Sequence, residues 1–381
     1  MRPLWTDRCG VTVSAVDRAQ SLEELVRGWR QHAPDLLLHD PGGRAEAVVR
    51  RGELLIAAER APDELDRLGR WVDDVHHSDG LGVARARLRR SERDRCVEIA
   101  RDRSAGVAAN HVHIGSEVLR GSPVMFGTGA DVRDYPAVPA PAEELWDPPV
   151  SVGVLDTGLD PHPWFAGRPW FREVREELDA DDDSGQDRQA GHGTFVAGVV
   201  LQRAPGAALR AHRALSSLGF TDDVRVAEGL RAIAKWADVV LVTSGCRTPD
   251  DECPPVLRAA LPDGAVVVAA AGNHGSSRPF WPAALPEVLA VGAAGPDGVR
   301  AEFSNWGEWV DAAAPGVDVA SSHVRLVPGE PDDRTYGCAR WSGTSFAAPQ
   351  IAGAVAAALH EGRRPGEAVE LTRDRHPFGG T

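Results

Sequence analysis

The sequence contains little of what defines several protein classes. Among its 381 residues are five cysteines, two methionines, two tyrosines and a single lysine, Lys235. An odd number of irregularly spaced cysteines in so long a chain does not fit a disulfide framework. No apolar run approaches the roughly 20 residues of a membrane helix, and Asp7, Arg8 and Cys9 interrupt the stretch where a secretory signal would be apolar. We therefore expect a cytoplasmic protein with free thiols.

The chain also lacks a basic surplus. Its 42 basic and 56 acidic residues give a formal net charge of −14, and residues 1–120 carry 20 of each kind, so the whole excess follows Arg120. An acidic surface repels nucleic acid and anionic membranes, and we expect neither as a partner. The 43% hydrophobic residues suffice for a sizeable core, and the length favours two domains.

Short apolar runs alternate with charged helical patterns in the first third of the chain. This predicts a small α+β domain over residues 1–120, with no motif that carries chemistry. The proline- and glycine-rich stretch 121–149 is typical of a linker. The expected helices are 22–29 and 62–75, and the expected strands are 53–58, 83–88 and 96–100.

Residues 150–361 have a different pattern, in which strands of branched apolar residues alternate with helices. Near-continuous apolar strands between helices predict an α/β fold, a parallel sheet covered on both faces. The polar segment 362–381 is expected to be a frayed tail.

Three segments of this second domain hold residues typical of nucleophilic catalysis. Asp156 ends a buried strand in VLDTG, His192 opens a helix in GHGT, and Ser345 opens another in SGTSFAAP. Taken singly, each is more often a turn, a structural histidine or a helix cap. Together they supply a hydroxyl nucleophile, a base that titrates near neutral pH, and a carboxylate to orient that base.

A fourth segment adds an amide. The apolar strand VVVAAAGN ends at Asn273, whose side chain can donate a hydrogen bond to an oxyanion. An isolated Asn before Gly275 would favour an ordinary turn, but the company of the other three segments favours an oxyanion donor.

These four motifs, in the order Asp, His, Asn, Ser, resemble those of the subtilisin-like serine peptidases, the subtilases, over about residues 150–360. The resemblance implies a three-layer fold with a parallel sheet and an acyl-enzyme mechanism. Asp156 would orient the base His192, Ser345 would attack, and Asn273 would bind the oxyanion. It also implies a peptide or protein substrate, no cofactor, no metal ligand at the site, and a monomer.

The strand DVVLVTSG resembles the family's substrate-pairing strand. Thr243, Ser244 and Gly245 would therefore bind an extended peptide, and Ala271 and Gly272 would contact it too; a plain core strand is the alternative. The segment from His274 to Phe280 (HGSSRPF) is short for the family and would border the specificity pocket, which His274 and Arg278 would influence.

Metal and thiol sites remain open alternatives. The family's Asn-rich calcium loop does not follow His192, so we expect no calcium there. The acidic run 179–183 fits a solvated loop better than a Ca²⁺ site. His111 and His113 share one strand face and would suit a metal, but no third ligand is evident in the sequence nearby, so a structural role is favoured. Cys246 and Cys253 are close enough in sequence for a disulfide, although reduced thiols are favoured.

Subtilases commonly carry an N-terminal propeptide that assists folding and inhibits the enzyme, and residues 53–114 fit that place by position alone. Our main hypothesis is an intracellular serine endopeptidase, either broad or dedicated to maturing one partner. The alternative is a catalytically silent peptide-binding or scaffold protein on the same fold.

Overall fold

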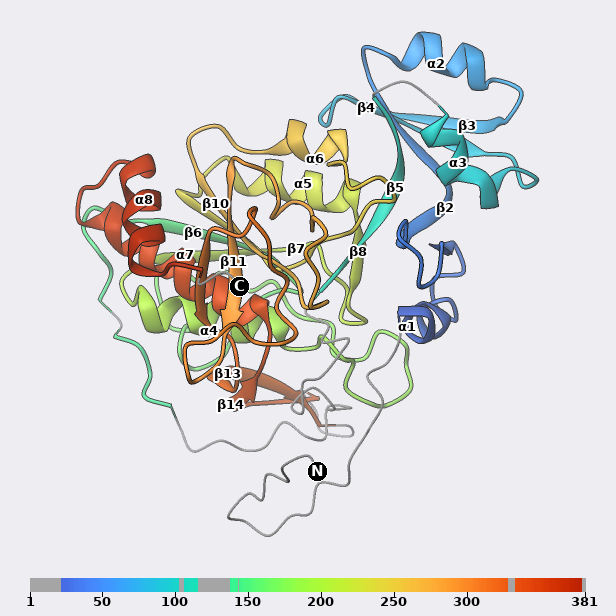
Figure 1. Cartoon of the computed structure of the whole chain (residues 1–381). Helices are drawn as coiled ribbons and strands as arrows, with labels where there is room; N and C mark the ends of the chain where they lie inside the picture. The colour runs from blue at the N-terminus through green and yellow to red at the C-terminus, as the bar shows by residue number, and fades with distance from the viewer. Residues whose placement is uncertain (1–21, 103–105, 116–137, 143, 328–332, 379–381) are drawn as a thin grey trace, which may run out of the picture.

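The computed structural model describes residues 22–102, 106–115, 138–142, 144–327 and 333–378. Its centre is a six-stranded parallel sheet (Figure 1), with the strand order β12-β11-β10-β9-β6-β7. The strands are β6 (Ser151–Asp156), β7 (Ala208–Arg213), β9 (Val239–Val242), β10 (Val266–Ala270), β11 (Val288–Ala294) and β12 (Ala312–Pro315).

Helices cover both faces of this sheet. Successive strand side chains point to opposite faces, so Val239 and Leu241 enter the core beneath α4 (His192–Arg203) and α7 (Thr344–His360). Val240 and Val242 enter the core beneath α5 (Asp223–Ile233) and α6 (Pro255–Ala260). The predicted three-layer α/β fold is therefore confirmed.

The strand order also explains where a site can form. From β6 the chain places β7 on one side, and later places β9 on the other side. The crevice beyond the carboxyl ends of β6 and β9 is therefore a topological switch point, where α/β sheets bind ligands. Asp156 ends β6, and Thr243 follows β9 directly.

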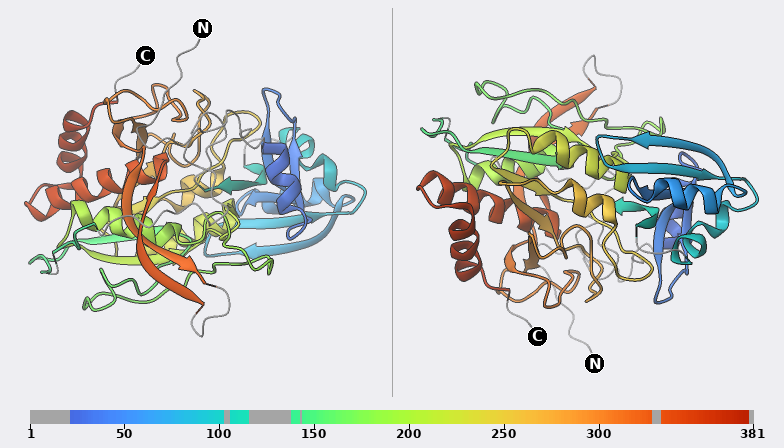
Figure 2. Two further views of the ribbon diagram at one scale, coloured as in Figure 1. Left: turned by 90° about the horizontal axis from the view of Figure 1, so that it is seen from below. Right: turned by 90° about the horizontal axis from the view of Figure 1, so that it is seen from above.

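The N-terminal domain is built on a second sheet, which is antiparallel. Its strand order is β3-β4-β2-β5-β8, and β1 also pairs with β2. Strand β8 comes from the peptidase-like part of the chain, so one sheet joins the two domains; both views of Figure 2 place the N-terminal domain at one end of the molecule. The elements are α1 (Leu22–Trp29), β1 (Leu36–His39), β2 (Ala47–Ala57), α2 (Ala61–Leu68), β3 (Val72–Ser78), β4 (Val83–Leu88), η1 (Arg93–Arg95), α3 (Cys96–Arg101), β5 (Val107–Ile114) and β8 (Phe220–Asp222).

Two local predictions in this domain were wrong. The helix expected over 62–75 ends at Leu68, and Val72 begins β3 instead. Residues 96–100 form a helix rather than a strand, because Cys96 is buried together with Ile99 and Ala100, three and four positions on. That spacing follows a helix face, although five residues are too few to distinguish it from a strand in the sequence.

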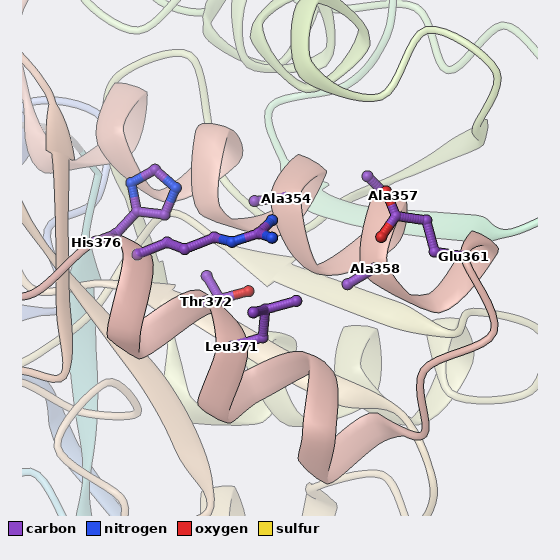
Figure 3. Close-up of a pocket in the computed structure, with 8 residues that line it drawn as sticks. Ala354, Ala357, Ala358, Glu361, Leu371, Thr372 and His376 are labelled. Carbon is purple, nitrogen blue, oxygen red and sulfur yellow. The ribbon is translucent and has the colours of Figure 1, made fainter.

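The prediction of a frayed tail over residues 362–381 was also wrong, because most of this segment is a helix. Helix α8 (Pro365–Arg375) packs on α7 and buries Ala368 and Thr372. Figure 3 shows Leu371 and Thr372 of α8 pointing towards α7 across a small pocket. Residues 121–137 of the expected linker lie outside the described residues.

The remaining elements are the antiparallel hairpin of β13 (Val319–Leu326) and β14 (Arg334–Trp341), which packs against α4. Among the described residues, no helix has the length and apolar character that crossing a membrane requires.

Candidate active site

The structure brings Asp156 and His192 into direct contact. His192 is the first residue of α4, and its Nδ1 lies 2.7 Å from Asp156 Oδ1. Both side chains are fully buried. Burial opposes ionisation of Asp156, but the neighbouring His192 and hydrogen bonds from Thr243 and the Thr157 N–H lower the pKa of this carboxyl below its ordinary value. An ionised Asp156 therefore fixes the ring orientation of His192.

Thr243 connects this pair to the serine. Its hydroxyl donates to Asp156 Oδ2 at 2.5 Å, and its carbonyl accepts the Ser345 hydroxyl at 3.0 Å. Thr243 therefore contacts both groups from the end of β9. In this arrangement His192 Nε2 is buried, and it has no hydrogen-bond partner among the described residues.

Asn273 lies beside the start of α7. Its Oδ1 accepts hydrogen bonds from the Thr344 backbone N–H and hydroxyl, both at 2.9 Å. These two bonds determine which end of the amide is oxygen, so the amide nitrogen faces the other way. Because Ser345 follows Thr344, all four predicted catalytic residues gather at one end of the sheet.

Aromatic rings enclose the histidine. Trp341 meets His192 edge-on with ring centroids 5.4 Å apart, and Phe346 lies 5.2 Å from it. Ser345 is itself only 1% exposed. The site is therefore closed to solvent in this arrangement.

Glu176 is a further residue of the site, and sequence reasoning missed it. It is fully buried and accepts hydrogen bonds from the Thr157 hydroxyl at 2.5 Å, the Gly191 N–H at 2.9 Å and the Thr194 N–H at 2.8 Å. Burial raises the pKa of Glu176 to about 7, against the lowering effect of these hydrogen bonds. Its carboxyl joins the turn after Asp156 to the start of α4. It lies in an irregular segment with acidic neighbours, so no pattern distinguished it.

The same junction needs a close approach of two backbones. A Cβ at Gly193 would lie 2.2 Å from the Gly158 carbonyl oxygen. Glycine at this position therefore lets α4 approach the turn after β6, which sets the distance between Asp156 and His192.

The predicted substrate strand is paired with the chain itself. Gly245 and Ile114 exchange both backbone hydrogen bonds, at 2.7 and 3.1 Å, and the Gly115 N–H donates to the Gly219 carbonyl at 3.0 Å. The end of β5 thus lies between two backbone segments as an added antiparallel strand. Peptide binding by Thr243, Ser244 and Gly245 stays a prediction.

Ala271 and Gly272 are placed differently. The Ala271 carbonyl accepts from the Asn305 side chain at 2.7 Å, and the Gly272 N–H donates to the Thr344 hydroxyl at 3.0 Å. The Gly272 carbonyl accepts the Asn305 N–H at 2.9 Å. These backbone groups already form hydrogen bonds within the chain. The predicted contact of Ala271 and Gly272 with a peptide would therefore be by van der Waals packing.

The influence of His274 and Arg278 on the specificity pocket stays a prediction. His274 is largely buried, and burial together with the charges of Arg247 and Arg278 lowers its pKa well below the ordinary value. Arg278 instead bonds Asp251 at 2.9 Å and the Glu46 carbonyl of the N-terminal domain at 3.2 Å.

The structure also bears on the thiol and metal sites that the sequence left open. Cys246 and Cys253 are free thiols, so the disulfide alternative does not hold here. Carboxylates of Asp179 and Asp183 accept N–H groups of their own loop, which fits a solvated acidic turn. His111 and His113 do meet a further pair of candidate ligands, Asp223 and Cys246, which the sequence separates by more than 100 residues.

Comparison with known proteins gives a consistent picture. A sequence model of the Subtilase family matches residues 148–372. A thermophilic serine proteinase of Bacillus sp. (strain AK1) is 35% identical over 246 residues, which are 60% of this chain and 58% of that protein. Subtilisin Savinase of Lederbergia lenta is 35% identical over 221 residues, 54% of this chain and 75% of its own length.

Among solved structures, a cold-adapted subtilisin-like serine proteinase is similar, with 28% identity and a TM-score of 0.48 over 68% of this chain and 96% of that one. The matched part of this chain corresponds to 58% of the length of the Bacillus proteinase and 75% of that of subtilisin Savinase. Because the family model covers over half of the sequence and includes all four motifs that we predict to be catalytic, the chain belongs to the subtilase family.

Proposed function

We propose that the chain is a serine endopeptidase that hydrolyses peptide bonds of peptide or protein substrates through an acyl-enzyme. One observation carries the proposal: hydrogen bonds connect the proposed base His192, its carboxylate Asp156 and the proposed nucleophile Ser345. Asp156 holds His192 through one oxygen and Thr243 through the other, and Thr243 in turn holds Ser345. A silent binding protein would have no chemical use for this connection.

The proposed reaction begins when Ser345 Oγ attacks the substrate carbonyl carbon and its proton passes to His192 Nε2. Asp156 stabilises the imidazolium that forms. His192 then gives the proton to the leaving amine, the C–N bond breaks, and an ester to Ser345 remains. Water, deprotonated by His192, attacks this ester and releases the acyl group.

Before attack, the Ser345 hydroxyl has to exchange partners. It now donates to the Thr243 carbonyl, and His192 Nε2 has no partner. Rotation about the Ser345 Cα–Cβ bond is the movement that we expect to transfer the hydroxyl from one to the other. This rotation would give His192 Nε2 the Ser345 hydroxyl as its hydrogen-bond partner.

The amide of Asn273 is the proposed oxyanion donor. Thr344 binds its oxygen with two hydrogen bonds, which turns the amide N–H groups away from Thr344. The Ser345 N–H, in the first turn of α7, is the second donor, and the helix dipole favours negative charge there.

The N-terminal domain is the proposed inhibitor of this site. Ile114 exchanges both backbone hydrogen bonds with Gly245, and an extended substrate at the proposed strand would need the same Gly245 groups. The domain also shares a hydrophobic core with α6, through Leu55 and Val83. Release of the domain would therefore free the substrate strand. Action inside the cell remains a prediction from the sequence.

The test is hydrolysis of a peptide library by the full chain, followed by mass spectrometry of both products and enzyme. We expect cleavage by the wild type and none by Ser345→Ala, with the N-terminal domain removed only from the wild type. Equal cleavage by both proteins would refute the assignment of Ser345. Binding of library peptides by both proteins without any cleavage would support the silent alternative. The cleavage pattern separates a broad peptidase from one dedicated to a single partner.

A further inference from the structure

A buried polar cluster lies where the N-terminal domain meets the peptidase domain. His111 and His113 come from β5, Asp223 begins α5, and Cys246 follows the proposed substrate strand. Figure 1 shows β5 reaching from the N-terminal domain to β8 and α5. All four side chains are at least 95% buried. Three separate segments therefore contribute to one enclosed cluster.

The carboxylate of Asp223 is oriented by His111. Its Oδ2 accepts both the His111 backbone N–H at 2.8 Å and His111 Nδ1 at 2.9 Å. Its Oδ1 is thereby directed to the other side, where His113 Nε2 lies at 2.8 Å and Cys246 Sγ at 4.0 Å. Such a hydrogen-bonded second carboxylate oxygen is typical of the outer shell around metal ligands.

The three inner atoms have the spacing of a metal site. His113 Nε2, Asp223 Oδ1 and Cys246 Sγ all lie within 4.8 Å of one another. A tetrahedral zinc ion separates nitrogen and oxygen ligands by about 3.4 Å and sulfur and oxygen ligands by about 3.6 Å. The His113–Asp223 separation of 2.8 Å and the Cys246–Asp223 separation of 4.0 Å each differ from these values by about half an ångström.

The charges of the cluster also match a divalent cation. The carboxylate of Asp223 supplies one negative charge, and His111 and His113 hold its two oxygens. A thiolate at Cys246 would add a second negative charge. With neutral imidazole, a divalent ion makes the whole site neutral, as an apolar interior requires.

We propose that His113, Asp223 and Cys246 form a binding site for a divalent transition metal of the zinc class. A nitrogen, an oxygen and a sulfur donor suit Zn²⁺ better than the hard cations Ca²⁺ and Mg²⁺, and three protein ligands leave one position for water. Ile114 of β5 pairs with Gly245 of the proposed substrate strand. His113 directly precedes Ile114 and Cys246 directly follows Gly245, so the bound metal would join β5 to the substrate strand. It thereby holds the N-terminal domain on the peptidase domain.

The experiment uses the full chain with Ser345→Ala, so its result does not depend on catalysis. Metal-stripped protein is titrated with Co²⁺, which reports thiolate ligation by a near-ultraviolet charge-transfer band, and with Zn²⁺, followed by thermal unfolding and metal analysis. We expect one equivalent of metal, a thiolate band, and a higher melting temperature with Zn²⁺. Cys246→Ser should lose the band and the temperature shift. His111→Gln should bind about 10- to 100-fold more weakly.

Cys253→Ser is the matched control, because this half-buried thiol lies near Cys246 but outside the ligand cluster. It should keep the band. Absence of stoichiometric binding to the wild-type site, a band that persists in Cys246→Ser, or a band lost only in Cys253→Ser would each overturn the proposal. Circular dichroism of each variant shows that loss of binding is not loss of folding.

Discussion

Glu176 makes the stability of this protein depend on pH in a way that can be calculated from the structure. Its pKa is raised from 4.5 to about 7 because the side chain is fully buried. A carboxyl with a raised folded-state pKa stabilises the fold below pH 4.5, and this contribution is lost as pH rises through 7. The shift corresponds to about 3 kcal/mol at 1.36 kcal/mol for each pH unit.

The substitution Glu176→Gln removes the ionisation but keeps the size. At low pH the protonated acid can donate to Thr157 while accepting the Gly191 and Thr194 N–H groups. The glutamine amide must instead turn its NH₂ towards one backbone N–H, which costs about 1–3 kcal/mol. At pH 8 the wild type carries a buried charge and the variant does not. The stability advantage of the wild type over Glu176→Gln should therefore fall by about 3 kcal/mol between pH 4.5 and pH 8.

Urea unfolding at pH 4.5, 6 and 8, in chains that also carry Ser345→Ala, measures this difference through tryptophan fluorescence. The neighbouring Glu177 is exposed, and Glu177→Gln is the matched control with no such trend. Stability curves of wild type and Glu176→Gln that stay parallel across this range would refute the reasoning.

Three further substitutions test other contacts of the site. Asn273→Ala should lower kcat about 100- to 1,000-fold with little change in KM in a peptide hydrolysis assay, a magnitude known for the oxyanion amide of a relative, subtilisin; a loss below tenfold would contradict an oxyanion role. Thr243→Val removes the hydroxyl from Asp156 and should cost about 1–3 kcal/mol of unfolding free energy in urea titrations, whereas an unchanged midpoint would show that this bond contributes nothing. Gly193→Ala should cost about 1–3 kcal/mol by overpacking, while Gly366→Ala, which meets no atom within 4 Å, should leave the melting temperature nearly unchanged; equal effects would contradict the close approach.

The parts of the site that the sequence predicted are those encoded locally. Asp156, Asn273 and Ser345 each stand at the end of a buried strand or the start of an apolar helix, and parallel topology brings such ends together. The apolar strands predicted the three-layer fold for the same reason, since β9, β10 and β11 are buried on both faces.

The parts that it could not predict depend on contacts across long sequence distances. Glu176 acts through backbone N–H groups that no sequence pattern reveals. The pairing of β5 with β8, and with it the contact of His113 with Asp223 110 residues away, follows only from docking of the two domains. Helix ends such as Leu68 were also missed, because an amphipathic pattern continued into β3.

The most direct test of the proposed peptidase mechanism is covalent labelling with a fluorophosphonate, located by mass spectrometry of proteolytic fragments. We predict one adduct, on the fragment that contains Ser345, no adduct in Ser345→Ala, and greatly reduced labelling in His192→Ala, because the serine then has no base. Equal labelling of wild type and Ser345→Ala, or an adduct confined to another fragment, would contradict the account.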